Sequence, residues 1–172
     1  MALFAKWGAC QFSDDGQVGE TLCVNVDARS CLAIGMDFNP ETIYWWLEQS
    51  KEAQLSILKE PRLPITTALV KLNTVAKGTK KMWSHESFDW AILRHHYEKA
   101  GIKCLIHHRD AQDLRTLVDL AQTPYDKGQF VRVGIQHNAL DDCLFQVKYA
   151  SAAITRIKRG LAWLKQEEGF QC

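Results

Sequence analysis

The sequence lacks the features that mark several large classes of protein. No stretch approaches the roughly 18 to 20 apolar residues of a membrane span, and the opening MALFAKWGACQF lacks the layout of a secretion leader. With 21 basic and 20 acidic residues the net charge is only +1, which argues against a broad basic face that coats duplex nucleic acid. We therefore expect a cytoplasmic protein without a membrane partner. A partner that is bound through only a few of its phosphates remains an open alternative.

The cysteines and histidines also lack the spacing of a disulfide scaffold or a zinc site. The six cysteines are scattered, without a Cys-x-x-Cys pair, which is typical of reduced thiols used as buried filler. The histidines include two adjacent pairs, but neighbouring residues face different directions and no finger-like spacing occurs. We expect His95 and His96 to be half exposed on a helix, and His107 and His108 to lie in a turn.

The length and the order of patterns predict one α/β domain over 1–172. Alternating apolar residues around Trp7, the turn signal Asp14-Asp15-Gly16 and the alternating run 18–26 predict a β-hairpin. Short strands then alternate with helices, which favours a mixed sheet with helices on its faces.

Local signals place the remaining elements. Asn39 and Pro40 suit the N-cap and the first position of a helix, and Ser50 suits the start of a second one. Apolar spacing predicts strands at 80–84 and 104–106 and helices over 68–76, 88–99, 110–122 and from residue 140 onward. The polar segment 123–134 is expected to be a mobile loop.

The sharpest local motif is His137-Asn138-Ala139-Leu140-Asp141-Asp142. His137 precedes the N-cap of the final helix and Asp142 lies in its first turn, so both can face one cleft, where the helix dipole helps to keep Asp142 ionised. A neutral imidazole beside a metal-binding carboxylate is what hydrolysis needs. Spacing alone does not separate this arrangement from an ordinary helix cap and surface acid.

A second candidate is Asp89, in the segment Ser84-His85-Glu86-Ser87-Phe88-Asp89 where a strand runs into a helix. This position places Asp89 near the carboxyl end of the sheet, where active sites of open α/β sheets gather. Taken alone, Asp89 is explained more simply as a first-turn acid favoured by the helix dipole.

The tryptophan pair Trp45-Trp46 offers another candidate for ligand contact. Neighbouring residues cannot both face the core, so one of the two rings is expected at the surface, where bases could stack on it. Burial is the simpler explanation for the other ring and for Trp83.

Four ordered segments, WWLEQSKEA, SFDWAILRHHYEKAGI, DLRTL and HNALDDCLFQVKY, extend over most of the chain. In this order and with these gaps they resemble the DEDDh superfamily of 3′-to-5′ exonucleases. The likeness is greatest to its phage and prophage branch of exoribonuclease-like and exonuclease VIII-type proteins.

The resemblance implies a ribonuclease H-like fold and a metal-dependent hydrolysis at the single-stranded 3′ end of DNA or RNA. Asp89 and Asp142 would be metal ligands, His137 the general base, and the metal Mg²⁺ or Mn²⁺, with two ions in the complete site. His85 and Phe88 are assigned to substrate contact. Asp113, in DLRTL, is assigned a structural role before a catalytic one.

The chain departs from the superfamily in one motif, because it contains no Asp-x-Glu. In the superfamily this motif lies on the first strand and supplies two of four metal-binding carboxylates. The opening residues resemble the strand that follows it, so we expect a sheet without its first strand. Either the natural reading frame begins further upstream, or the chain is a degraded or repurposed relative. The open edge would favour a homodimer. Two functions stay open: a 3′-to-5′ exonuclease, or an impaired domain that binds nucleic-acid ends or a protein.

Overall fold

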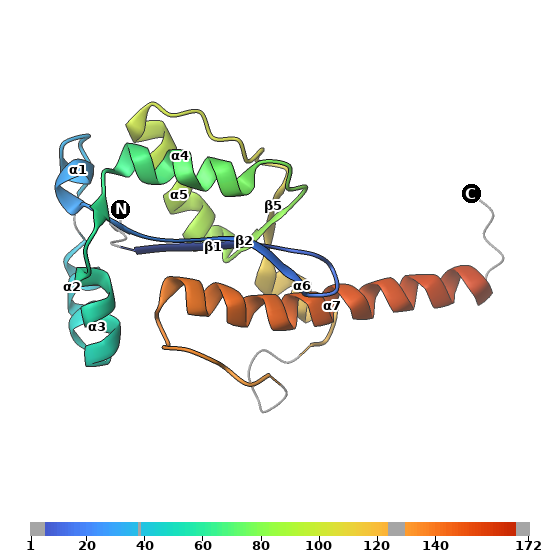
Figure 1. Ribbon diagram of the computed structural model, residues 1–172. Coiled ribbons are helices and arrows are strands. Elements are labelled where there is room, and N and C mark those ends of the chain that lie inside the picture. Colours follow the sequence, from blue (N-terminus) through green and yellow to red (C-terminus); the bar gives the residue numbers. More distant parts are fainter. Residues whose placement is uncertain (1–5, 38, 124–129, 168–172) are drawn as a thin grey trace.

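The structure, a computed structural model, describes residues 6–37, 39–123 and 130–167 (Figure 1). Part of the predicted loop at 123–134 therefore lies outside the described residues. The elements in chain order are β1 (Lys6–Phe12), β2 (Val18–Val26), α1 (Ala28–Leu32), α2 (Pro40–Leu47), α3 (Lys51–Leu58), β3 (Arg62–Leu63), α4 (Ile65–Ala76), β4 (Met82–Ser84), a π-helical turn (Glu86–Trp90), α5 (Ala91–Ala100), β5 (Ala111–Asp113), α6 (Leu114–Leu120) and α7 (Ala139–Glu167).

The predicted hairpin is confirmed. β1 and β2 pair antiparallel, with Trp7 opposite Val24. The turn between them is closed by a 2.8 Å bond from the Gly16 N–H to the Ser13 carbonyl, and Gly16 has a φ of 90°, which glycine adopts without strain. β3 then adds to β2 in parallel, so this three-stranded sheet is mixed.

β4 and β5 form a second, parallel sheet of two strands. β1 and β4 are edge strands of their sheets, and both line one cavity of about 1920 Å³. Within the described ranges, no strand lies between them. The α/β class with a mixed sheet flanked by helices is confirmed, and the interrupted sheet agrees with the expectation that a ribonuclease H-like strand is lacking.

Helices cover both faces of the β1–β2 ribbon: α4 and α5 lie on one side and α7 lies on the other (Figure 1). Beneath α4 and α5 the core is formed by Val26, Ile65, Leu69 and Tyr97, all nearly inaccessible to solvent. A second cluster joins α6 to α7 and includes Leu114, Val118, Phe145 and Ala150. α7 thus packs on the first sheet and on the helix that follows the second.

The predicted strand at 104–106 is wrong. The chain there is irregular, because the side chain of Asn73 on α4 fixes it: the Asn73 amide donates to the Lys103 carbonyl at 2.9 Å and its oxygen accepts the Leu105 N–H at 3.1 Å. The strand is instead β5, made of Ala111, Gln112 and Asp113. Three apolar residues in a row were too short a pattern to distinguish a strand from a loop.

The helix predicted over 110–122 begins later, at Leu114. Asp113 is its N-cap, since one carboxylate oxygen accepts the Thr116 N–H at 2.8 Å and the Thr116 hydroxyl at 3.0 Å. This structural role is the one assigned to Asp113 from the sequence.

The prediction that His96 is half exposed is also wrong. His96 is fully buried, its Nδ1 lies 2.6 Å from the Ile92 carbonyl, and its ring meets the Trp7 ring edge-on at 5.3 Å between centroids. His95 is half-buried. Within the described part of the chain, no helix combines the length and apolar character required to cross a bilayer.

Candidate active site

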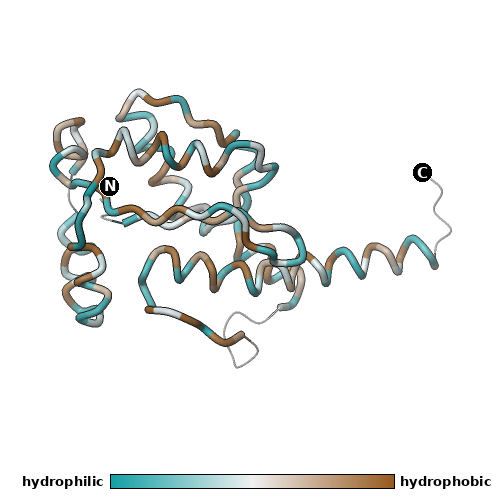
Figure 2. The backbone as a smooth tube through the Cα atoms, viewed as in Figure 1, coloured by the Kyte–Doolittle hydropathy of each residue, from teal (hydrophilic) through white to brown (hydrophobic). Residues whose placement is uncertain are grey.

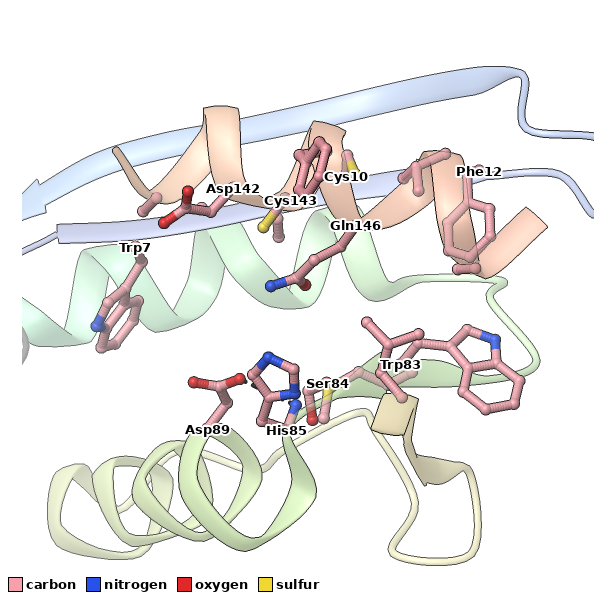
Figure 3. A pocket seen from close by; sticks show the side chains of 18 of the residues that line it. Trp7, Cys10, Phe12, Trp83, Ser84, His85, Asp89, Asp142, Cys143 and Gln146 are labelled. Atoms are coloured by element: carbon pink, nitrogen blue, oxygen red, sulfur yellow. Dashed lines mark hydrogen bonds between the residues drawn. The ribbon is translucent and has the colours of Figure 1, made fainter. Parts of the chain in front are cut away.

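The cavity between β1 and β4 is called the cleft below. All five residues that the sequence singled out as site candidates line it: His85, Phe88, Asp89, His137 and Asp142. Figure 3 shows Asp89 and Asp142 extending toward the same space from opposite sides. The structure therefore places residues from two distant segments along the same cavity.

Asp89 lies in the π-helical turn between β4 and α5, rather than in the first turn of an α-helix. Its Oδ2 accepts the His85 N–H at 3.0 Å, and its own N–H donates to the His85 carbonyl at 2.8 Å. These reciprocal bonds fix the carboxylate just beyond the end of β4. Such π-turns inside helices often occur at functional sites.

The surroundings of Asp89 are mostly buried. Burial raises the pKa of the Asp89 carboxyl, and the N–H that it accepts from His85 opposes this rise. Nearby, His85 Nδ1 and Ser84 Oγ are buried without a hydrogen-bond partner among the described residues. Polar atoms of this kind favour a polar ligand at this wall of the cleft. Phe88, by contrast, is half exposed.

His137 and Asp142 are held at the start of α7. His137 has a φ of 64°, a left-handed conformation that is uncommon for a histidine. The turn is closed by a 3.1 Å bond from the Asn138 N–H to the Ile135 carbonyl, and the Asp142 N–H then donates to the Asn138 carbonyl at 2.9 Å. His137 precedes the helix and Asp142 lies in its first turn, as predicted.

A glycine on β1 allows α7 to begin where it does. A Cβ at Gly8 would lie 2.3 Å from the backbone carbon and oxygen of Ala139, the first residue of α7. No larger side chain fits without moving the helix start, and with it His137 and Asp142.

Two contacts at this wall were not foreseen. Arg132 pairs with Asp142 and lies 4.3 Å above the centre of the Phe145 ring. The Trp45 ring meets the His137 ring edge-on, with centroids 5.0 Å apart. The sequence had suggested Trp45 or Trp46 only as a surface for bases, and an arginine in a polar loop gives no periodic pattern that would reveal its partner.

The thiols in the cleft do not form an alternative site. Cys10 and Cys143 line it, but burial raises the pKa of both thiols, so neither is a ready thiolate nucleophile. The five described cysteines are free.

The fit of these residues to a divalent cation is partial. Carboxylate oxygens are the donors that Mg²⁺ and Mn²⁺ prefer, and Mg²⁺ is often bound by one or two carboxylates together with water and phosphate oxygens. Asp89 and Asp142 fit that role in the kind of donor that they supply. Over 6–37, 39–123 and 130–167, however, no group of three or more His, Cys, Asp or Glu side chains could hold a metal ion by itself. The residues therefore do not fit a two-ion centre.

An α/β fold with carboxylates and a histidine lining one cleft offers the acid and base groups that a hydrolase uses. The chain belongs to the 3'-5' exoribonuclease Rv2179c-like domain family, whose family model matches residues 2–154. This membership supports a 3′-to-5′ exonuclease class, and hence a nuclease. Neither a curated protein nor a solved structure matched the chain.

Proposed function

We propose that the protein is a metal-dependent 3′-to-5′ exonuclease of the DEDDh superfamily, within the phage and prophage branch, that shortens single-stranded 3′ ends. The observation that carries the proposal is the presence of Asp89, His137 and Asp142 in one cleft. The family name favours RNA over DNA as the substrate.

Each residue has a distinct role in this proposal. Asp89 and Asp142 would hold Mg²⁺ or Mn²⁺, and the bound ion would lower the pKa of water. His137 accepts the proton of the attacking water, and its edge-on contact with Trp45 fixes the plane of the imidazole. Half-exposed Phe88 offers a face for the terminal base, and the unpartnered His85 Nδ1 a polar contact.

A second candidate function is a binding module for nucleic-acid ends that does not hydrolyse them. One observation favours it: within the described residues no group of three metal-binding side chains is present. A site with fewer metal-binding side chains loses affinity for Mg²⁺ more than it loses contacts to bases and phosphates.

The experiment is a time course on 5′-labelled single-stranded RNA and on DNA with a 3′ overhang, with Mn²⁺ or with EDTA. The exonuclease predicts a ladder that shortens from the 3′ end, depends on Mn²⁺ and is abolished by Asp142→Ala. The matched control is Asp119→Ala, an acid on α6 outside the cleft.

The two candidates give different results. A binding module shifts the same oligonucleotides in a gel without shortening them. Products that persist in Asp142→Ala would disprove the site, because a first-turn ligand cannot be removed without effect on the proposed chemistry.

A further inference from the structure

Asp142 is already engaged by a positive charge. The Arg132 guanidinium donates from Nη1 to the Asp142 Oδ1, and both side chains keep contact with solvent, at 33% and 28% exposure. The guanidinium also lies over the Phe145 ring. Arg132 therefore occupies a carboxylate oxygen that the proposed function assigns to a cation.

Phe130 packs its ring edge-on against Tyr149 of α7, and beyond it the chain around Arg132 is attached to α7 through polar groups. Lys148 Nζ donates to the Val131 carbonyl at 2.6 Å, and the Ile135 N–H donates to the Asp141 Oδ2 at 2.9 Å. Val131 and Val133 are apolar but largely exposed. Figure 2 shows hydrophobic colouring along the segment just before α7. The polar contacts around Arg132 are weak individually and readily exchanged.

A guanidinium and a metal ion cannot share one carboxylate oxygen without mutual repulsion. We propose that Arg132 exchanges between two partners: it pairs with Asp142 while the site is empty, and it binds a phosphate of the nucleic acid once Asp142 holds a cation. This inference rests on the proposed function and assigns to Arg132 a role in positioning the substrate.

The second partner follows from the place of Arg132 in the fold. Arg132 lines the cleft together with His137 and Asp142, so its guanidinium remains beside the reacting groups after it leaves the carboxylate. The planar fork of N–H groups matches phosphate oxygens, and it forms two parallel bonds with them. The same side chain therefore suits both an empty site and a substrate-bound one.

The test compares Arg132→Gln with Arg94→Gln, which removes an arginine from an exposed pair with Glu98. Calorimetry measures Mn²⁺ binding, and then binding of adenosine monophosphate at saturating Mn²⁺. In Arg132→Gln we expect Mn²⁺ to bind about twofold to fivefold more tightly, and the monophosphate about tenfold more weakly. Arg94→Gln should change neither affinity.

Opposite changes in the two affinities identify the exchange, because a misplaced loop would lower both. Mn²⁺ affinity that does not rise in Arg132→Gln, or a monophosphate affinity that does not fall, overturns the inference. Asp142→Asn separates this result from failure of the proposed site: if Asp142→Asn weakens Mn²⁺ binding while Arg132→Gln has no effect, only the exchange fails. If Asp142→Asn binds Mn²⁺ as the parent does, the proposed ligand and the exchange fail together.

Discussion

Asp89 and Asp142 face the same cleft, but the wall behind each carboxylate is built differently. Asp89 is fixed by reciprocal bonds with His85, ahead of a helix whose inner face carries the fully buried His96. Asp142 is held by an ion pair with Arg132, in a region attached through hydrogen bonds, a left-handed turn at His137 and the rings of Trp45 and Phe130.

We call the side of the cleft that carries Asp89 and His85 the rigid wall. The side that carries Asp142, Arg132 and His137 is called the adjustable wall. Buried packing tolerates little displacement, whereas exposed charge pairs exchange partners at low cost in free energy. Under the proposed function, such a cleft would keep one metal ligand in place while the other side responds to cation and substrate. The following changes test the two walls separately.

The largest expected effect is that of His137→Ala, which removes the proposed base from the adjustable wall. The rate of single-turnover hydrolysis should fall by about 10²-fold to 10⁴-fold. Mn²⁺ affinity, measured by calorimetry, should not change, because the two carboxylates remain. Loss of Mn²⁺ binding in this variant would contradict the role of His137 as a base.

Gly8→Val changes the junction of the adjustable wall with β1. The added side chain would overlap the backbone of Ala139, so the free energy of unfolding in urea should fall by about 3 kcal/mol. Gly160→Ala is the control: nothing lies within 4 Å of a Cβ there, and alanine should stabilise α7 by about 0.5 to 1 kcal/mol. Equal stability of Gly8→Val and the parent would show that α7 moves freely along β1.

Trp45→Ala removes the ring that orients His137. An edge-on ring contact contributes about 0.5 to 1.5 kcal/mol, so kcat should fall by about twofold to tenfold with little change in KM. Trp45→Phe retains a ring and should recover most of the loss. A change confined to KM would instead identify Trp45 as a surface for the substrate base.

The smallest effect concerns His96, behind the rigid wall. Burial lowers the pKa of His96, with a minor contribution from neighbouring His95. At a pH just below 6.5, the usual pKa of histidine, the unfolded chain therefore binds more protons than the folded chain. The free energy of unfolding is therefore highest above pH 6.5, where His96 is neutral in both states, and it decreases as the pH falls toward the folded-state pKa. Tm measured at pH 7.5, 6.5 and 5.5 should decline less in His96→Phe than in the parent, and equal declines would exclude His96 as the cause.

Local chemistry made much of the fold predictable. The turn at 14–16 and the cap at Asn39 depend on a few neighbouring residues, and the structure has both. The sharing of one cleft by Asp89 and Asp142 followed from the resemblance and from the order of elements. Long-range contacts were not predictable in the same way: the Asn73 side chain determines the backbone at 103–105, and nothing in the adjacent pair at 95–96 shows which ring is buried.

The interruption between β1 and β4 has a consequence for how the protein unfolds. Within the described residues no ladder of hydrogen bonds joins the two sheets, while α7 packs on β1 and on α6. Cooperativity between the sheets must therefore pass through helix packing and not through a continuous sheet. Amides of β2 and of β5 should accordingly exchange with solvent as two groups with different opening free energies. A change that loosens α7 should increase the difference between these two free energies.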